Sequence, residues 1–461
     1  YYTQEDIKEI VDYAKKRFID VIPEIEMPGH SLASLASYPE NSCTGGPFDV
    51  INTWGVMKDV YCAGKDSTFI FLQNILDEII ELFPYEYIHI GGDEVPKDRW
   101  KACEKCQKRI SEENLKDEAE LQTYFITRIA DYLKTKNRKI IGWEEILEGG
   151  LTKGATVQSW TGFKGAITAA NLNHQAICSP YSHTYLNSDP KDLDIKTCYS
   201  FIPVPPELSG EKAQFICGSE ANLWTENAPQ ETVDSKLFPR LLALSEVFWT
   251  NHENKNYKDF YKRLQNHYNF LKKTGIKFGR EGKAISYTTK FDNSKKLFIA
   301  SFKAEEKDIV LRYTLNGDTP AINSPILNQP LYISNNAVLK VSGFKFNHPV
   351  FTPITLNFSS HKGLGASVGL TYPYAEKYSA NGANSLTDGI RGLENFREGN
   401  WQGFEGTDME AVIDLGKEMT VSKIAIDCLQ DASSWIFFPT EVSFYISDDN
   451  LNFRNIATEI N

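Results

Sequence analysis

The sequence predicts a multidomain protein that begins with a (β/α)8 TIM barrel, of which about six strands are present, and continues into β-rich regions. Short apolar strand patterns alternate with helical patterns through residues 1–280, which indicates parallel βαβ units. Polar and aromatic residues gather where these strands end, the place where such barrels keep their chemistry. From about residue 287 the helical patterns stop and short alternating stretches replace them.

The first predicted element is a helix at residues 7–18, because Thr3 and Asp6 have the spacing of a capping box. The chain therefore starts at a helix, and only about six strands follow where a closed barrel needs eight. The predicted strand segments are residues 22–30, 87–92, 140–145, 157–160, 176–180 and 215–224, and the clearest helical patterns are residues 71–82, 121–135 and 257–271.

Length and composition bound the class of protein. The 461 residues allow two or three domains, and 41% hydrophobic with 12% aromatic residues fits a well-cored globular protein. A net charge of −12 argues against nucleic acid and anionic membranes as partners. No apolar run approaches membrane-spanning length.

The most informative segment is residues 87–94 (YIHIGGDE), a short strand that ends in two glycines and two adjacent carboxylates. The glycines let the backbone leave the strand and let another group approach closely. Asp93 and Glu94 are therefore candidates for paired acid and base work. The alternative is structural: Asp93 caps the following helix, and Glu94 is a solvated acid in its first turn.

The cysteines are too sparse for a disulfide scaffold. The eight are Cys43, Cys62, Cys103, Cys106, Cys178, Cys198, Cys217 and Cys428. Cys103 and Cys106 have the spacing of half a zinc site, but no second ligand pair follows at a suitable spacing. We interpret these two residues as a local disulfide or as two buried thiols.

Several motifs in the same order resemble glycoside hydrolase family 20, the β-N-acetylhexosaminidases, of the kind found in Bacteroidetes. They are residues 23–30 (PEIEMPGH), 89–94 (HIGGDE), 142–145 (GWEE), 158–160 (QSW), 222–226 (NLWTE) and 239–246 (PRLLALSE), with Trp249. The resemblance implies a catalytic barrel over residues 1–280 with two strands upstream of residue 1. For this chain alone we therefore expect an open barrel with two exposed edges, weak or absent activity and poor solubility.

The resemblance implies an exo-acting enzyme that removes terminal β-linked N-acetylglucosamine or N-acetylgalactosamine from glycans, with retention. In that family the substrate's own 2-acetamido oxygen attacks the anomeric carbon and forms an oxazolinium ion. By motif match Glu94 is the acid/base, Asp93 orients the acetamido group, and Tyr185 hydrogen-bonds the acetamido carbonyl. The alternative for Tyr185 is an ordinary loop tyrosine.

Other residues at strand ends are expected to hold the sugar. Trp143, Trp160 and Trp224 each follow a strand and can stack on a sugar ring or wall the acetamido methyl, although strand-end aromatics are more often core residues. Glu226 would accept hydrogen bonds from sugar hydroxyls, or else cap a helix.

Two further candidates depend on the resemblance. Asn187 stands where the family usually has Asp, so it would contact a sugar hydroxyl without bringing charge. His30 is expected beside Glu94, partnered by an aspartate upstream of residue 1, with a purely structural histidine as the alternative. No role is assigned to four further charged residues at the barrel end, Glu24, Glu26, Glu144 and Glu145.

Residues 281–360 are predicted to form a β-sandwich. Alternating stretches recur at residues 297–302, 309–314 and 338–344, with a turn signal at residues 316–318 (NGD). The region resembles the β-rich module that follows the barrel in bacterial hexosaminidases and chitobiases, and its expected role is structural.

Residues 365–461 resemble a discoidin, or factor type C, domain, a β-jelly roll used as a family 32 carbohydrate-binding module. The resemblance rests on residues 384–389 (NSLTDG), 401–404 (WQGF), 411–416 (AVIDLG), 433–439 (SSWIFFP) and 442–449 (VSFYISDD). The chain stops before that domain's usual closing strands, which implies an incomplete jelly roll.

Within this last region four residues are candidates for binding Ca²⁺ or a glycan. Asp388 resembles a position near the bound Ca²⁺ of such modules, with a plain turn aspartate as the equal alternative. Trp401, Phe404 and Trp435 are the bulky candidates for glycan contact, but Trp435 lies in an apolar run and is expected in the core, and Trp401 in a structural motif.

Two functions follow from these patterns: a hexosaminidase acting on amino-sugar glycans, or a glycan-binding scaffold whose barrel is catalytically dead. The intact Asp93 and Glu94 favour the enzyme. The strands expected upstream of residue 1 favour the scaffold for this polypeptide, because by resemblance they carry the arginine that grips the sugar. A metal hydrolase is disfavoured because no His/Asp cluster has ligand spacing, and no cofactor is expected beyond a structural Ca²⁺. The resemblance implies an extracellular, periplasmic or outer-membrane location. The sequence starts at Tyr1 without a signal peptide, which gives no information about the compartment.

Overall fold

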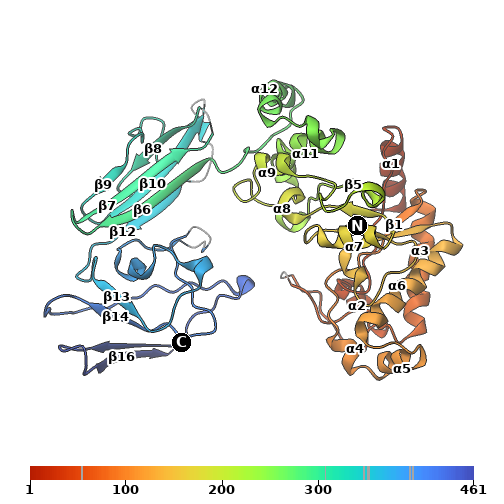
Figure 1. Ribbon diagram of the computed structural model, residues 1–461, viewed down its shortest axis with the longest axis horizontal. Coiled ribbons are helices and arrows are strands. Elements are labelled where there is room, and N and C mark those ends of the chain that lie inside the picture. The colour runs from red at the N-terminus through yellow and green to blue at the C-terminus, as the bar shows by residue number, and fades with distance from the viewer. Residues whose placement is uncertain are drawn as a thin grey trace. The chain divides into compact units, whose positions relative to one another are not determined.

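The computed structural model describes residues 1–52, 55–306, 308–345, 348–349, 353–393, 396 and 399–460. The chain separates into two compact units, Tyr1–Arg280 and Glu281–Asn461 (Figure 1). Each unit has its own hydrophobic core. Among the described residues no helix is both long and apolar enough to cross a bilayer.

The first unit alternates strands and helices. Its strands are β1 (Tyr87–His89), β2 (Lys139–Trp143), β3 (Thr156–Ser159), β4 (Ala176–Cys178) and β5 (Ile216–Ser219). Its α-helices are α1 (Gln4–Lys15), α2 (Leu32–Ser37), α3 (Asp66–Leu82), α4 (Asp98–Ala102), α5 (Glu104–Glu112), α6 (Glu118–Thr135), α7 (Lys164–Asn171), α8 (Tyr181–Thr184), α9 (Ile195–Ser200), α10 (Val233–Leu237), α11 (Arg240–Trp249) and α12 (Tyr257–Lys273). Short 3-10 turns include η1 (Pro39–Asn41), η2 (Glu144–Leu147) and η4 (Thr225–Asn227).

The five strands form one parallel sheet in the order β1-β2-β3-β4-β5. Residues 23–27 extend it beyond β1 as a sixth parallel segment, with a single bridge from Glu24 to His89 and a hydrogen bond from Met27 N to Ile90 O of 3.0 Å. The full strand predicted at residues 22–30 is thus reduced to a bridged segment. Pro23 and Pro28 lack the N–H groups that a continuous ladder would need.

Within the described part of the chain the sheet is open, as predicted. β5 pairs with β4 alone, and no ladder joins β5 to residues 23–27 at the other flank. Cys217 and Gly218 in β5 are exposed, and so is Ile22 beside the sixth segment. Unpaired strand edges of this kind invite association with other chains.

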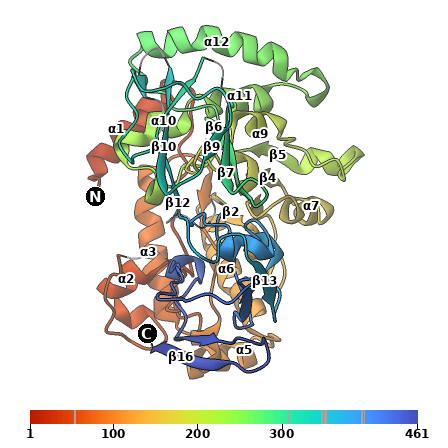
Figure 2. The ribbon, with the colours of Figure 1, turned by 90° about the vertical axis from the view of Figure 1, so that its left-hand side faces the viewer.

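Helix α6 packs into the first core through one apolar face. Leu121, Phe125, Ile129 and Leu133 recur at four-residue intervals in α6, and all four are buried in the first core. They share that core with Ile88 of β1. Figure 2 shows α12 as one long helix beside α11 at the edge of the same unit.

The capping box predicted for the first helix is confirmed. The Thr3 hydroxyl accepts from Asp6 N at 3.2 Å, and the Asp6 carboxylate accepts from Thr3 N at 2.8 Å. The helix spans Gln4–Lys15 and so ends before the predicted residue 18, because Phe18 has left-handed backbone with φ 59°.

The second unit is built from antiparallel strands. They are β6 (Ile285–Asp292), β7 (Leu297–Ala304), β8 (Val310–Thr314), β9 (Leu331–Ile333), β10 (Ala337–Lys345), β11 (His348–Pro349), β12 (Ile354–Phe358), β13 (Ser367–Leu370), β14 (Ala411–Asp414), β15 (Glu441–Ile446) and β16 (Arg454–Ile460). One sheet holds β6, β7 and β9, and another holds β8, β10, β11 and β12. Phe298 of the first sheet packs on Phe358 of the second, with ring centroids 5.1 Å apart, in one shared core.

The last hundred residues form two separate strand pairs, β13–β14 and β15–β16. The incomplete jelly roll and the division of this unit near residues 360–365 stay predictions. The core position expected for Trp435 is wrong: its side chain is 85% exposed, because it follows the 3-10 turn η10 (Ala432–Ser434) in a left-handed conformation. Trp401 is half-buried and its indole N–H donates to Leu393 O, which agrees with a structural role.

We expect Gly149→Ala to lower the free energy of unfolding more than Gly154→Ala. Both glycines have left-handed φ, 71° and 80°, so each alanine costs about 1 kcal/mol in backbone strain. A Cβ on Gly149 would also overlap the backbone of Ala119 in α6, whereas nothing lies within 4 Å of one on Gly154. Urea unfolding followed by tryptophan fluorescence measures both losses, and equal losses would contradict tight packing of this loop on α6.

Candidate active site

A glycine turn follows the strand that carries the two candidate acids. Gly91 and Gly92 have φ values of 69° and 93°, which favour glycine. A Cβ on Gly91 would overlap the Glu26 carboxylate, and Gly92 N donates to Glu26 Oε1 at 3.0 Å. The glycines therefore let the turn fold directly against Glu26, and they place the next two residues past the regular strand.

His30, Asp93 and Glu94 form a cluster at this turn. His30 Nε2 lies 3.4 Å from Asp93 Oδ2 and 3.3 Å from Glu94 Oε2. His30 and Glu94 both have left-handed backbone, with φ 44° and 46°, a strain that residues with side chains usually avoid outside functional sites. The hydrogen bond to Asp93, opposed by burial and aided by the two carboxylate charges, raises the pKa of His30. A protonated His30 therefore offsets the charges of both acids.

Two further acids lie beneath the cluster, and each has a different protonation state. Burial first, and then the charge of Asp93, raises the pKa of Glu26 to about 10, so Glu26 keeps its proton at neutral pH. Glu24 accepts from Trp143 Nε1 at 2.8 Å and lies 3.3 Å from His89 Nδ1. Burial would raise the pKa of Glu24, but the interactions with His89 and Trp143 outweigh it and lower that pKa.

A cavity of about 190 Å³ opens beside these acids. Its lining residues are Glu24, Trp143, Glu220, Ala221, Asn222, Leu223 and Trp224. The Trp143 and Trp224 rings lie 6.0 Å apart and are tilted by 46°. Two of the three predicted tryptophans, Trp143 and Trp224, therefore line one cavity together with the carboxylates of Glu24 and Glu220.

The third tryptophan, Trp160, lies against Tyr185 instead, with ring centroids 6.3 Å apart and 28° between the planes. Its indole N–H is 3.2 Å from both carboxylate oxygens of Glu145. Burial raises the pKa of Glu145 to about 7. Burial also raises the pKa of Tyr185, and the charges of Glu220, Asp93 and Glu145 add to that shift. The Tyr185 hydroxyl thus stays protonated near three acids of the site.

Tyr185 is fixed by its neighbours in the backbone. Leu186 N donates to Asn222 O at 2.8 Å, and Asn222 N donates to Thr184 O at 2.9 Å. The Arg240 guanidinium, fully buried, donates to Leu186 O at 2.6 Å and to Leu193 O at 3.0 Å. Arg240 thus ties α11 to the loop that carries Tyr185.

The remaining candidates lie at the ends of the same loops. The buried Oδ1 of Asn187 has no hydrogen-bond partner in the described part of the chain. Glu226 lies exposed in η4, two residues after Trp224. Buried oxygens without partners are uncommon in folded proteins and mark Asn187 for a ligand, whereas Asp93 shares a hydrogen bond with the Glu26 carboxyl group.

Sequence reasoning left several of these residues without a role. Glu24, Glu26 and Glu145 face the site, whereas Glu144 is structural because it accepts from Ser159 Oγ at 2.9 Å and Thr161 N at 2.7 Å. Glu220 was missed, although it directly follows β5 and could have been found by the same strand-end rule. Arg240 lies in the motif at residues 239–246, but no role was assigned to its side chain from the sequence.

The site also contains a possible cation-binding trio. The ligand atoms of His30, Asp93 and Glu94 lie within 4.8 Å of one another. Because His30 already forms an ion pair with one oxygen of each carboxylate, we assign no metal to this trio.

Comparison with known proteins places the chain in a family. The family described as "Glycosyl hydrolase family 20, catalytic domain" matches residues 1–252. The β-hexosaminidase of Porphyromonas gingivalis is 42% identical over 362 residues, which cover 74% of this chain and 46% of that protein. The β-hexosaminidase of Vibrio furnissii is 32% identical over 264 residues, 53% of this chain and 43% of that protein. The chain therefore spans about half the length of these relatives.

Solved structures of similar sequence support the same family. The β-N-acetylhexosaminidase of Bacteroides fragilis superposes with a TM-score of 0.56 at 35% identity, over 61% of this chain and 59% of that one. The chitobiase of Flavobacterium johnsoniae superposes with a TM-score of 0.56 at 35% identity, over 60% of this chain and 43% of that one. Because the family match takes in more than half of the 461 residues, and its motifs build the acid cluster and the tryptophan-walled cavity, the chain belongs to glycosyl hydrolase family 20.

Proposed function

We propose that the protein is an exo-β-N-acetylhexosaminidase that removes terminal N-acetylglucosamine or N-acetylgalactosamine from glycans. The observation that carries this proposal is the cluster of Asp93 and Glu94 on His30, together with the cavity that Trp143 and Trp224 line. A carboxylate at Asp93 suits the N–H of a 2-acetamido group. Hydrolysis of 4-nitrophenyl β-N-acetylglucosaminide and its galactosamine epimer by the full-length protein tests the proposal.

The proposed reaction uses the substrate as its own nucleophile. The 2-acetamido oxygen attacks the anomeric carbon, the glycosidic bond breaks, and Glu94 gives a proton to the departing oxygen. Water then opens the oxazolinium ion, and Glu94 takes a proton from that water. Two displacements at one carbon retain the configuration. Attack from within the same molecule gains its rate from proximity.

Asp93 and Tyr185 hold the acetamido group in this scheme. Asp93 accepts a hydrogen bond from the acetamido N–H. It also stabilises the positive charge that develops when the acetamido group closes into the oxazolinium ring. Tyr185, kept protonated by burial and nearby acids, donates to the acetamido oxygen. Glu26 supports the pair because it keeps its own proton at neutral pH, so it adds no second negative charge beside Asp93.

The sugar itself is held at the rim. Trp143 and Trp224 offer apolar faces to the ring and the acetamido methyl, and Trp160 closes the side next to Tyr185. Asn187 and Glu226 are the proposed contacts for sugar hydroxyls. A catalytically dead scaffold has less support, because the acids, the tyrosine and the aromatic walls are all in place.

We further propose that the second unit is accessory. Residues 281–360 would be the family's β-rich C-terminal domain, and residues 365–461 a discoidin-like glycan binder. Asp388 already accepts from Asn381 Nδ2 and Ile390 N, both at 2.9 Å, so Ca²⁺ there would have to share or displace those bonds. An extracellular, periplasmic or outer-membrane location belongs to the same proposal, and fractionation of the source cells tests it.

Glu94→Gln and Asp93→Asn should both lose hydrolytic activity, but with a different dependence on the leaving group of the substrate. Without its acid, Glu94→Gln should lose about 10²–10⁴-fold in kcat/KM on a disaccharide and much less on a 4-nitrophenyl glycoside, whose leaving group needs no proton. Asp93→Asn should lose activity on both substrates, because the acetamido nucleophile is weakened. Glu9→Gln, on the exposed face of α1, controls for a lost carboxylate. Near-wild-type turnover of the disaccharide by either variant would refute its role.

Glu26→Gln should stabilise the protein relative to the wild type as pH rises. The contribution of the protonated Glu26 is complete below its unfolded pKa of 4.5 and is lost as pH rises toward the folded value of about 10. Glutamine has the shape of the protonated acid and no proton to lose. The difference in Tm, variant minus wild type, should therefore grow between about pH 5 and about pH 9. A difference that stays flat or shrinks would show that Glu26 is ionised in the folded state.

A further inference from the structure

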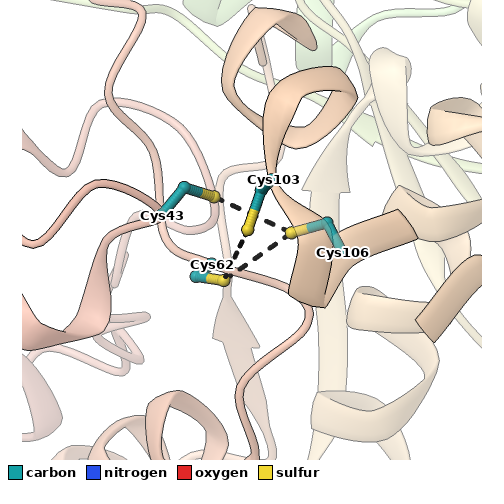
Figure 3. Close-up of side chains that lie close together, drawn as sticks. All are labelled: Cys43, Cys62, Cys103 and Cys106. Atoms are coloured by element: carbon teal, nitrogen blue, oxygen red, sulfur yellow. Dashed lines mark hydrogen bonds between the residues drawn. The ribbon is translucent and has the colours of Figure 1, made fainter. Parts of the chain in front are cut away.

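Four cysteines outside the acid cluster converge in the first unit (Figure 3). Cys62 Sγ lies 3.6 Å from Cys106 Sγ and 3.9 Å from Cys103 Sγ, and Cys43 Sγ lies 3.7 Å from Cys106 Sγ. All four sulfurs are within 4.8 Å of one another. Cys62, Cys103 and Cys106 are buried and Cys43 is half-buried. Half of the protein's cysteines therefore share one small volume.

The spacing fits one metal ion. Four sulfurs at about 2.3 Å from a central zinc form a tetrahedron whose edges are about 3.8 Å long. The three sulfur–sulfur distances of 3.6, 3.7 and 3.9 Å lie on either side of that edge length. We propose that Cys43, Cys62, Cys103 and Cys106 bind a structural zinc ion. A closed set of four thiolates leaves no position for a substrate, so the ion would cross-link the chain and take no part in catalysis.

The surrounding backbone is suited to thiolates. Cys103 is the N-cap of α5 and Cys106 lies in its first turn, where helix N–H groups favour negative charge. A Cβ on Gly64 would overlap the backbone of Lys105 and Cys106, so glycine is what lets these two segments meet.

The ligands come from three segments that the rest of the fold already brings together. Cys43 and Cys62 follow Ser42 and Tyr61, which form an antiparallel bridge, and Cys62 N donates to Asn41 O at 2.8 Å. The Trp100 indole N–H donates to Tyr61 O at 2.9 Å and joins α4 to the same bridge. The ion would thus tie the loop that follows His30 to the segment that follows Asp93 and Glu94.

Disulfides fit this arrangement less well. Two disulfides would single out one partner for each sulfur, yet Cys62 and Cys106 each have two neighbours at similar distances. Of the two interpretations that the sequence left open, the local Cys103–Cys106 disulfide is not formed, and the two buried thiols agree with the structure, since both cysteines are free and buried. The four-cysteine cluster was missed because a second closely spaced pair was sought, whereas folding supplies two single cysteines from distant positions.

Metal analysis of the full chain, purified without chelator, tests the proposal. Mass spectrometry should find about one zinc ion per chain, and 4-hydroxymercuribenzoate should release it to a chromogenic chelator. Cys106→Ser, which removes the sulfur with two close neighbours, should lose the zinc and lower Tm, whereas Cys198→Ser, a buried cysteine outside the cluster, should keep the metal. None of these readouts depends on glycosidase activity.

Cobalt substitution keeps the test decisive if Cys106→Ser does not fold. Wild-type chain loaded with Co²⁺ in place of zinc should show the visible bands of a tetrahedral ion and a near-ultraviolet sulfur-to-cobalt charge-transfer band. A metal-free chain that takes up neither ion would overturn the proposal. So would peptide mapping that finds disulfides among these four cysteines, and stoichiometric iron would overturn the choice of zinc.

Discussion

Repulsion among carboxylates crowded at one end of a parallel sheet is the constraint on which the site depends. Parallel strands deliver all their C-terminal residues to the same rim, and here that rim receives Glu24, Glu26, Asp93, Glu145 and Glu220. So many acids cannot all be ionised at close range. The structure resolves the conflict in three ways: a histidine cation against Asp93 and Glu94, a retained proton on Glu26, and indole N–H groups on Glu24 and Glu145.

This solution requires unusual backbone, which the surrounding structure supports. The Gly91–Gly92 turn can fold onto Glu26 only without side chains, and Glu94 and His30 adopt left-handed conformations. The buried Arg240 holds the Tyr185 loop by donating to the carbonyl oxygens of Leu186 and Leu193, so a buried cation helps to fix the geometry of the pocket. Zinc at the four-cysteine cluster would add a second brace on the segments that carry His30 and the acid pair.

The sequence could predict what is encoded locally. The alternation of strands and helices, the Thr3 capping box and the strand-end positions of Asp93 and Trp143 all follow from short patterns. Long-range features could not be predicted in this way. Prolines limit the pairing of the first segment to residues 23–27. A left-handed turn places Trp435 at the surface, and Cys43 and Cys62 meet Cys103 and Cys106 only through tertiary folding. The protonation states of Glu26 and Glu145 likewise depend on burial that no local pattern records.

Participation of the substrate's acetamido group is the central claim, and a fluorine series tests it most directly. The full-length protein would be assayed on 4-nitrophenyl glycosides of N-acetyl-, N-fluoroacetyl-, N-difluoroacetyl- and N-trifluoroacetylglucosamine. Each fluorine withdraws electrons from the attacking oxygen, so kcat/KM should fall steeply at every step. A rate that is indifferent to fluorine would contradict the account, because the anomeric carbon would then be attacked by a protein carboxylate or by water.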